Sequence, residues 1–333
     1  MTLFDPDLAA GPGPGGPGRS TGGDEETDGE RAGANRTGTE RRPAGTEKRP
    51  AGSESGRPSA GDEDHVSPAA PEVTTRLRLD VAYDGSRFRG FAAQPGQRTV
   101  GGELAAALAV VVGHAVELVC AGRTDAGVHA TGQVVHLDVH PDTDPERVVR
   151  SVNALLGPEI ALRAARPAPP DFDARRSARA RRYRYLVLEA PTPDPLLARL
   201  AWQVAGPLDL RAMQGAADAL LGEHDFRAFC RRVPGTAPGT PIVRRVLDAR
   251  LSPTPVAPGD LAAGARLIRF DVCATSFCHQ MVRSIVGVLV DVGRGRRRAS
   301  DVVWLLRSGD RARGGNVIAP PQGLCLVAVD YGP

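Results

Sequence analysis

The sequence predicts an α/β (α+β) fold of two ferredoxin-like β-α-β-β-α-β halves. They share a mixed, mainly antiparallel sheet, with helices packed on one face and a central active-site cleft. Three observations support this fold class. Apolar residues alternate with polar ones in short segments between residues 76 and 331, as in half-buried strands. Capped helical segments separate these strands. The order of segments in the first half recurs in the second, and two such halves usually leave a cleft between them.

The first half contains alternating strands and two helices. Thr99 is a typical N-cap, and it predicts a helix that presents apolar residues up to Val111. Asp144, followed by proline at the first helical position, predicts a second helix that ends at Gly157. The expected strands lie at 77–83, 116–120, 135–139 and 159–166, and the loop 122–132 joins the second and third of them.

The second half follows the same pattern. A helix with apolar residues from Leu210 to Leu221 is expected to end at Gly222, and a long apolar helix is expected near 277–292. The expected strands lie at 181–189, 201–204, 243–251, 266–273 and 323–331.

Composition divides the chain into three parts. Residues 1–73 are rich in Gly, Pro and charge, so we expect a disordered leader, followed by halves at 74–177 and 178–333. The leader has 14 acidic and 8 basic residues, a charge of −6. The remaining 25 acidic and 34 basic residues carry +9, which fits a polyanionic partner.

Several classes of protein are disfavoured. No run of eighteen uncharged apolar residues is present, so no membrane span is expected. The five cysteines are scattered and contain no CxxC pair, which argues against a disulfide framework or a zinc site and favours a reducing cytoplasm.

The loop between the second and third expected strands carries Arg123 and Asp125 between two glycines. Glycines permit a tight turn and the close approach of a ligand. By spacing alone, a polar turn in which Asp125 bonds its own backbone is an equally good interpretation.

Two further segments carry candidate residues. Alternation at 180–185 places Tyr183 and Tyr185 on one face of a strand and Arg182 and Arg184 on the other, an arrangement suited to stacking on an unpaired base beside a phosphate. A core tyrosine pair beside solvated arginines is the alternative.

Arg283 interrupts an apolar helix, where it needs a carboxylate partner unless it reaches solvent at the helix edge. His279 and Cys278 lack further ligands at metal-site spacing.

Taken together, these segments resemble the bacterial tRNA pseudouridine synthase A family, over roughly residues 76–331. The most specific match is Gly122-Arg123-Thr124-Asp125-Ala126-Gly127-Val128-His129. Tyr83-Asp84-Gly85-Ser86, Phe172-Asp173-Ala174-Arg175, Gly222-Glu223-His224-Asp225-Phe226 and Met281-Val282-Arg283 follow in family order. The chain departs from the family at Phe91-Ala92 in place of Trp-Gln, at Gly101 in place of glutamine, and at Cys278 in place of a branched aliphatic.

The resemblance implies an isomerase that converts uridine to pseudouridine at positions 38, 39 and 40 of the tRNA anticodon stem and loop. Asp125 then takes the place of the catalytic aspartate, and Tyr183 that of the tyrosine stacking on the target uracil. Arg283 takes the place of the arginine that pairs with the aspartate, and Arg123 that of the arginine that helps to extrude the nucleotide. The resemblance also implies a cytoplasmic homodimer without a metal or organic cofactor.

Two other functions remain as alternatives at this point. One is a non-catalytic RNA-binding protein with RNA-recognition-like halves, which does not need an arginine in an apolar helix opposite a loop aspartate. The other is a glycosidase or nucleosidase, which normally uses a second carboxylate. None evidently accompanies Asp125.

Overall fold

The computed structural model of the protein describes residues 74–232, 235, 237, 239–255, 261–312 and 318–332. The expected leader, residues 1–73, lies outside this range. The described residues form ten strands and five α-helices. The strands are β1 (Thr75–Tyr83), β2 (Val119–Cys120), β3 (His129–Val139), β4 (Ile160–Ala168), β5 (Ala180–Glu189), β6 (Trp202–Val204), β7 (Gly222–Asp225), β8 (Val243–Pro253), β9 (Arg266–Ala274) and β10 (Leu324–Asp330). The helices are α1 (Val100–Val112), α2 (Pro145–Leu156), α3 (Leu210–Asp218), α4 (Met281–Gly293) and α5 (Ser300–Ser308).

All ten strands belong to one sheet of order β4-β1-β3-β10-β5-β9-β8-β7, with β2 on β3 and β6 on β5. Only the β3–β10 and β5–β6 pairs are parallel among these strands. The predicted mixed, mainly antiparallel sheet is therefore confirmed.

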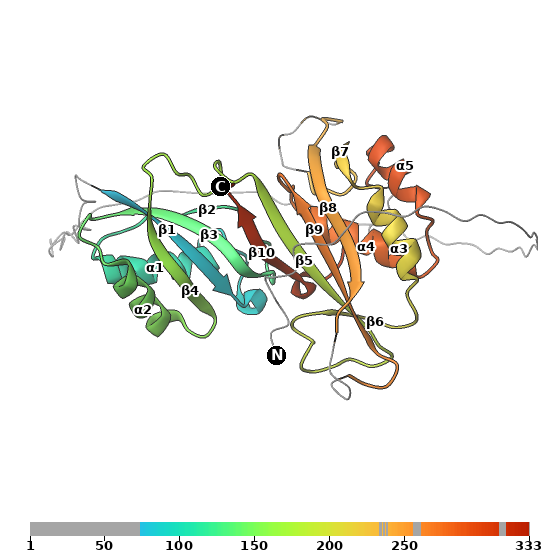
Figure 1. Ribbon diagram of the computed structural model, residues 1–333, viewed down its shortest axis with the longest axis horizontal. Helices are drawn as coiled ribbons and strands as arrows, with labels where there is room; N and C mark the ends of the chain where they lie inside the picture. Colours follow the sequence, from blue (N-terminus) through green and yellow to red (C-terminus); the bar gives the residue numbers. More distant parts are fainter. Residues whose placement is uncertain are drawn as a thin grey trace, which may run out of the picture. The chain divides into compact units, whose positions relative to one another are not determined.

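The last strand lies in the middle of the sheet (Figure 1). β10 separates β3 of the first half from β5 of the second, and Leu326 is the cross-strand partner of Ala130 on one side and of Tyr183 on the other. This register places the start of β3, and hence the loop before it, one strand away from Tyr183 of β5.

The helices pack with the strands into one core. Leu77, Leu79 and Val81 of β1 and Val187 of β5 belong to the same buried cluster as the apolar faces of the α-helices. In Figure 1, α1 and α2 accompany β1–β4, whereas α3, α4 and α5 accompany β7–β9. Burial of this continuous apolar surface is the main stabilising contribution to the fold.

The expected helix starts are confirmed where a capping side chain was evident. The Thr99 hydroxyl accepts from the backbone N–H of Gly102 at 3.2 Å, and Asp144 accepts from Glu146 at 2.9 Å. α3 is shorter than expected, because a tight turn in which Leu220 donates to Ala217 at 3.0 Å replaces its last helical turn.

The largest difference between the expected and the observed elements concerns α4, the long apolar helix of the second half. It begins at Met281 and not near Phe277. Gln280 has φ 65°, a left-handed conformation that a continuous helix does not tolerate, so residues 277–280 form a separate turn. The sequence pattern also missed α5 and β7. α5 lacks a capping side chain, and β7 is a polar edge strand, Gly-Glu-His-Asp, without apolar alternation.

Gly132 tests the contact between β3 and β10. A Cβ at Gly132 would overlap the backbone carbonyl of Val327, whereas a Cβ at Gly215 in α3 would meet nothing within 4 Å. We expect Gly132→Ala to lower the melting temperature by about 5–10 °C, because backbone must move to admit the methyl group. Gly215→Ala should be neutral or slightly stabilising. Equal melting temperatures in thermal unfolding by circular dichroism would contradict this close approach.

Candidate active site

Buried polar side chains hold the loop that carries Asp125. The hydroxyl groups of Tyr83 and Thr124 lie 2.8 Å apart, and both residues are buried. The Gln133 amide donates to the carbonyl of Gly122 at 2.7 Å and accepts from the N–H of the same residue at 3.4 Å. The backbone N–H and C=O of Gly122 are thus satisfied by Gln133 and not by the Asp125 side chain.

Asp125 is paired with Arg283. The guanidinium Nη1 of Arg283 donates to Oδ2 of Asp125 at 3.1 Å, and its Nε donates to the carbonyl of Ala319 at 2.8 Å. The side chains of Asp125 and Arg283 are 23% and 15% exposed. A charge this far buried needs a partner, so the prediction that the helix arginine meets a carboxylate is confirmed, and the solvent-reaching alternative is wrong.

Tyr183 lies beside this pair. Its phenol oxygen is 3.6 Å from the position that a Cβ on Gly122 would take, and its ring packs edge-on against Phe277, with centroids 5.0 Å apart. Burial first, and then the negative charge of Asp125, raise the pKa of Tyr183 far above its ordinary value. The phenol is therefore protonated at neutral pH.

His279 is a site residue that the sequence did not identify. Its Nε2 lies 3.3 Å from Oδ1 of Asp125, the carboxylate oxygen that Arg283 does not contact. The only sequence signal was a histidine four residues before Arg283. His279 lies outside α4, in the turn that ends at the left-handed Gln280, so helical spacing does not describe its position relative to Arg283.

Comparisons with known proteins agree with this geometry. A family described as tRNA pseudouridine synthase matches residues 81–175 and 216–332. Proteins named tRNA pseudouridine synthase A from Frankia casuarinae, Bordetella petrii and Methylobacterium sp. are 45%, 41% and 44% identical over 262, 261 and 257 residues. These alignments cover 78%, 78% and 77% of this chain and 90%, 92% and 97% of the relatives.

The chain belongs to the tRNA pseudouridine synthase family. It is therefore an isomerase that acts on uridine in tRNA. The non-catalytic RNA-binding alternative is excluded by this membership. No helix among the described residues is long and apolar enough to cross a membrane.

Phe91 and Gly101, two departures expected from the family resemblance, lie in contact with each other. The Phe91 carbonyl accepts from the N–H of Gly101 at 2.8 Å, and a Cβ on Gly101 would lie 2.6 Å from that carbonyl and 3.3 Å from the Phe91 ring. Gly101 thus makes room for Phe91, whose own N–H donates to the carbonyl of Thr124 at 3.1 Å. Phe91 thus bonds directly to the loop that carries Asp125.

The third departure concerns Cys278. Cys278 forms a disulfide with Cys230, with Cα atoms 5.8 Å apart, a pair that the cysteine pattern did not predict, although one pair is not a disulfide framework. Sequence spacing could not reveal the pair, because 48 residues separate the two cysteines. No group of three or more His, Cys, Asp or Glu side chains within the described ranges is placed to hold a metal ion.

The other arginines of the candidate segments, Arg182, Arg184 and Arg123, differ in their contacts. Arg184 is buried and pairs with Asp271 of the neighbouring strand β9 at 2.9 Å, and Arg182 pairs at 3.2 Å with Asp248 of β8, the next strand beyond β9. The suggested partnership of these two arginines with a phosphate therefore finds no support. Arg123 is exposed, and no hydrogen bond or ion pair of its side chain occurs in the described part of the chain.

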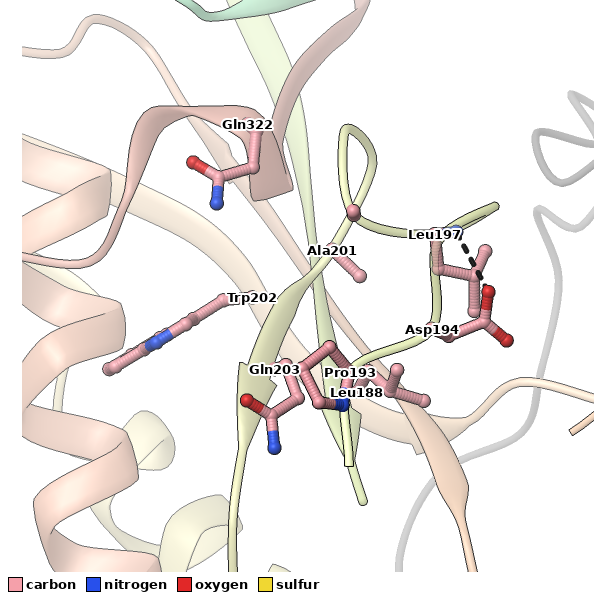
Figure 2. Close-up of a pocket in the computed structure, with 9 residues that line it drawn as sticks. Leu188, Pro193, Asp194, Leu197, Ala201, Trp202, Gln203 and Gln322 are labelled. Atoms are coloured by element: carbon pink, nitrogen blue, oxygen red, sulfur yellow. Dashed lines mark hydrogen bonds between the residues drawn. The ribbon is translucent and has the colours of Figure 1, made fainter. Parts of the chain in front are cut away.

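A hollow of about 230 Å³ lies near the ends of β5 and β6 (Figure 2). Its lining includes Trp202, Gln203 and Gln322, but none of Asp125, Tyr183 and Arg283. The hollow is therefore not lined by the candidate site residues, and the central cleft expected from the sequence stays a prediction.

The cysteine pair gives a direct prediction. Alkylation of the unfolded protein without reductant should label three cysteines, and labelling after reduction should reach all five, because only Cys230 and Cys278 are joined. In the folded protein Cys120 and Cys325 should react slowly, because burial raises the pKa of each thiol to about 11. Intact mass spectrometry counts the labels. Five labels without reductant would contradict the disulfide.

Proposed function

We propose that this enzyme forms pseudouridine at positions 38, 39 and 40 of the tRNA anticodon stem and loop, with Asp125 as its catalytic carboxylate. The observation that carries the proposal is the ion pair between Asp125, in the Gly122–His129 loop, and Arg283 of α4. The chain in which this pair occurs belongs to the family. The pair supplies a positioned carboxylate with a fixed counter-ion. Membership of the tRNA pseudouridine synthase family favours an isomerase over a glycosidase.

The reaction breaks the C1′–N1 bond of uridine, turns the uracil within the site and forms a C1′–C5 bond. The C5 proton is then lost and N1 gains one, so product and substrate are isomers. In this proposal Asp125 either attacks C1′ or removes a proton from C2′ to give a glycal. Both routes need a carboxylate beside the sugar and a site that retains the detached uracil.

The other residues bind the target nucleotide. A uridine in a stem must leave the base stack, at a cost of about a few kcal/mol. Stacking on Tyr183 would recover about 1–3 kcal/mol. Since Tyr183 is 7% exposed and packs against Phe277, the Phe277 ring must yield when uracil enters. We assign the exposed Arg123 to extrusion of the nucleotide from the stem. We assign Arg283 to holding the Asp125 carboxylate in position beside the extruded nucleotide.

We further propose that the enzyme acts in the cytoplasm as a homodimer and uses no metal or organic cofactor. The family resemblance supports the dimer and the absence of a cofactor, and tRNA as substrate supports the compartment. In this proposal residues 74–177 and 178–333 act as the two catalytic halves, one supplying Asp125 and the other Tyr183 and Arg283.

The central prediction concerns Asp125. Asp125→Asn keeps the shape and removes the charge, so pseudouridine formation on an unmodified tRNA transcript should fall by roughly 10³-fold or more. Binding of the transcript should change by less than about threefold, because phosphate contacts supply most of the affinity. Nucleotide-resolved pseudouridine mapping and a filter-binding assay provide the two measurements.

The matched control is Asp142→Asn, since the Asp142 side chain is 91% exposed and distant in sequence from the loop. It should leave turnover unchanged. A folded Asp125→Asn enzyme with near-normal turnover would remove the basis of the proposal, because asparagine forms the same turns as aspartate.

Tyr183 provides a second test. Tyr183→Phe keeps the ring and should retain RNA affinity, whereas Tyr183→Leu should weaken binding of an anticodon stem-loop RNA roughly tenfold. Because the phenol is already protonated at neutral pH, the Phe variant should show the same pH dependence of binding as the wild type. Fluorescence anisotropy measures the affinity. Equal dissociation constants for the Phe and Leu variants, at similar melting temperatures, would refute stacking.

A further inference from the structure

Residues 277–280 form a turn that faces the catalytic loop. Phe277 packs against Tyr183, and Gln280 takes a left-handed conformation although it is not glycine. A strained backbone of this kind persists where the surrounding structure holds it, and such residues cluster at functional sites. In this turn, just before α4, the imidazole of His279 lies 3.3 Å from Asp125.

Bonds on both sides fix the backbone of this turn. The carbonyl of His279 accepts from the N–H of Arg231 at 2.9 Å, and the preceding residue, Cys278, is joined to Cys230. On the other side, Arg311 donates to the Gln280 side chain at 3.2 Å. Although the His279 side chain is 45% exposed, its attachment point is therefore held in place.

The two oxygens of Asp125 have different neighbours. Arg283 lies 3.1 Å from Oδ2, and His279 Nε2 lies 3.3 Å from Oδ1. At 3.3 Å the imidazole and the carboxylate are within ion-pair range but do not form a hydrogen bond in this arrangement, and contacts of catalytic groups shorten when substrate binds. With a neighbour on each oxygen, the carboxylate cannot rotate without losing one of them.

We propose that His279 is a positioning residue, whose Nε2–H holds Oδ1 of Asp125 and so sets the carboxylate plane for attack on the ribose. The inference rests on the proposed catalytic role of Asp125. An imidazole donates from Nε2 both as the protonated ring and as the neutral Nε2–H tautomer, so the role needs a donor and not a charge.

Two amide variants separate positioning from other roles. The amide nitrogen of glutamine lies as many bonds from Cα as Nε2 of histidine, whereas that of asparagine is one bond nearer. On unmodified tRNA transcripts, His279→Gln should keep kcat within about threefold of the wild type. His279→Asn should lower kcat roughly 10- to 100-fold, the effect typical of lost orienting contacts. KM should stay within about threefold for both variants.

His140→Asn is the matched control, because His140 Nδ1 lies 3.5 Å from Asp142 at the exposed end of β3. It should leave kcat and KM unchanged. The melting temperatures of the two His279 variants should agree within about 3 °C, which makes their kcat values comparable.

The outcomes discriminate between hypotheses. Equal kcat for His279→Gln and His279→Asn, whether low or normal, overturns the positioning role, as does an increase confined to KM. In these outcomes the wild type is active and Asp125→Asn is not, so the proposed function stands. Normal turnover by Asp125→Asn, or no pseudouridine from the wild type, overturns the proposed function together with this inference.

Discussion

The register of β10 is the constraint on which the site depends. One residue of this strand, Leu326, lies opposite Ala130 of β3 and opposite Tyr183 of β5. A shift of one residue would turn every side chain of the strand to the other face of the sheet. It would also separate the catalytic loop from the tyrosine that lies beside it. The last strand therefore joins the two halves and sets the geometry between them.

The segment leading into β10 carries that constraint to the catalytic group. The Ala319 carbonyl accepts from Arg283, and the Pro320 carbonyl accepts from the Tyr185 hydroxyl at 2.7 Å. Pro321 follows, and its Cγ lies 2.9 Å from the position that a Cβ on Gly127 would occupy. Three consecutive residues thus touch the helix arginine, the tyrosine strand and the aspartate loop. One short segment thus contacts three groups that are distant from one another in the sequence, through two backbone carbonyls and one proline ring.

Much of this structure was accessible from the sequence. Alternation at 77–83 and the capping residues Thr99 and Asp144 predicted their elements because strand period and capping are local properties. Arg283 was recognised because an arginine in an apolar helix needs a partner wherever the helix lies. The Gly122–His129 motif identified the loop, and the family comparison agreed with it.

Tertiary structure decided what local pattern could not express. His279 meets Asp125 through a left-handed Gln280, and Cys230 meets Cys278 across 48 residues, although neither pair has a periodic signal. Arg182 and Arg184 looked like ligands for phosphate, but cross-strand carboxylates engage them. The sequence by itself determined most of the elements, the family and the identity of the candidate carboxylate, because these follow from local chemistry and motif. Only the fold decided which side chains surround that carboxylate, because their distances depend on strand register and backbone turns.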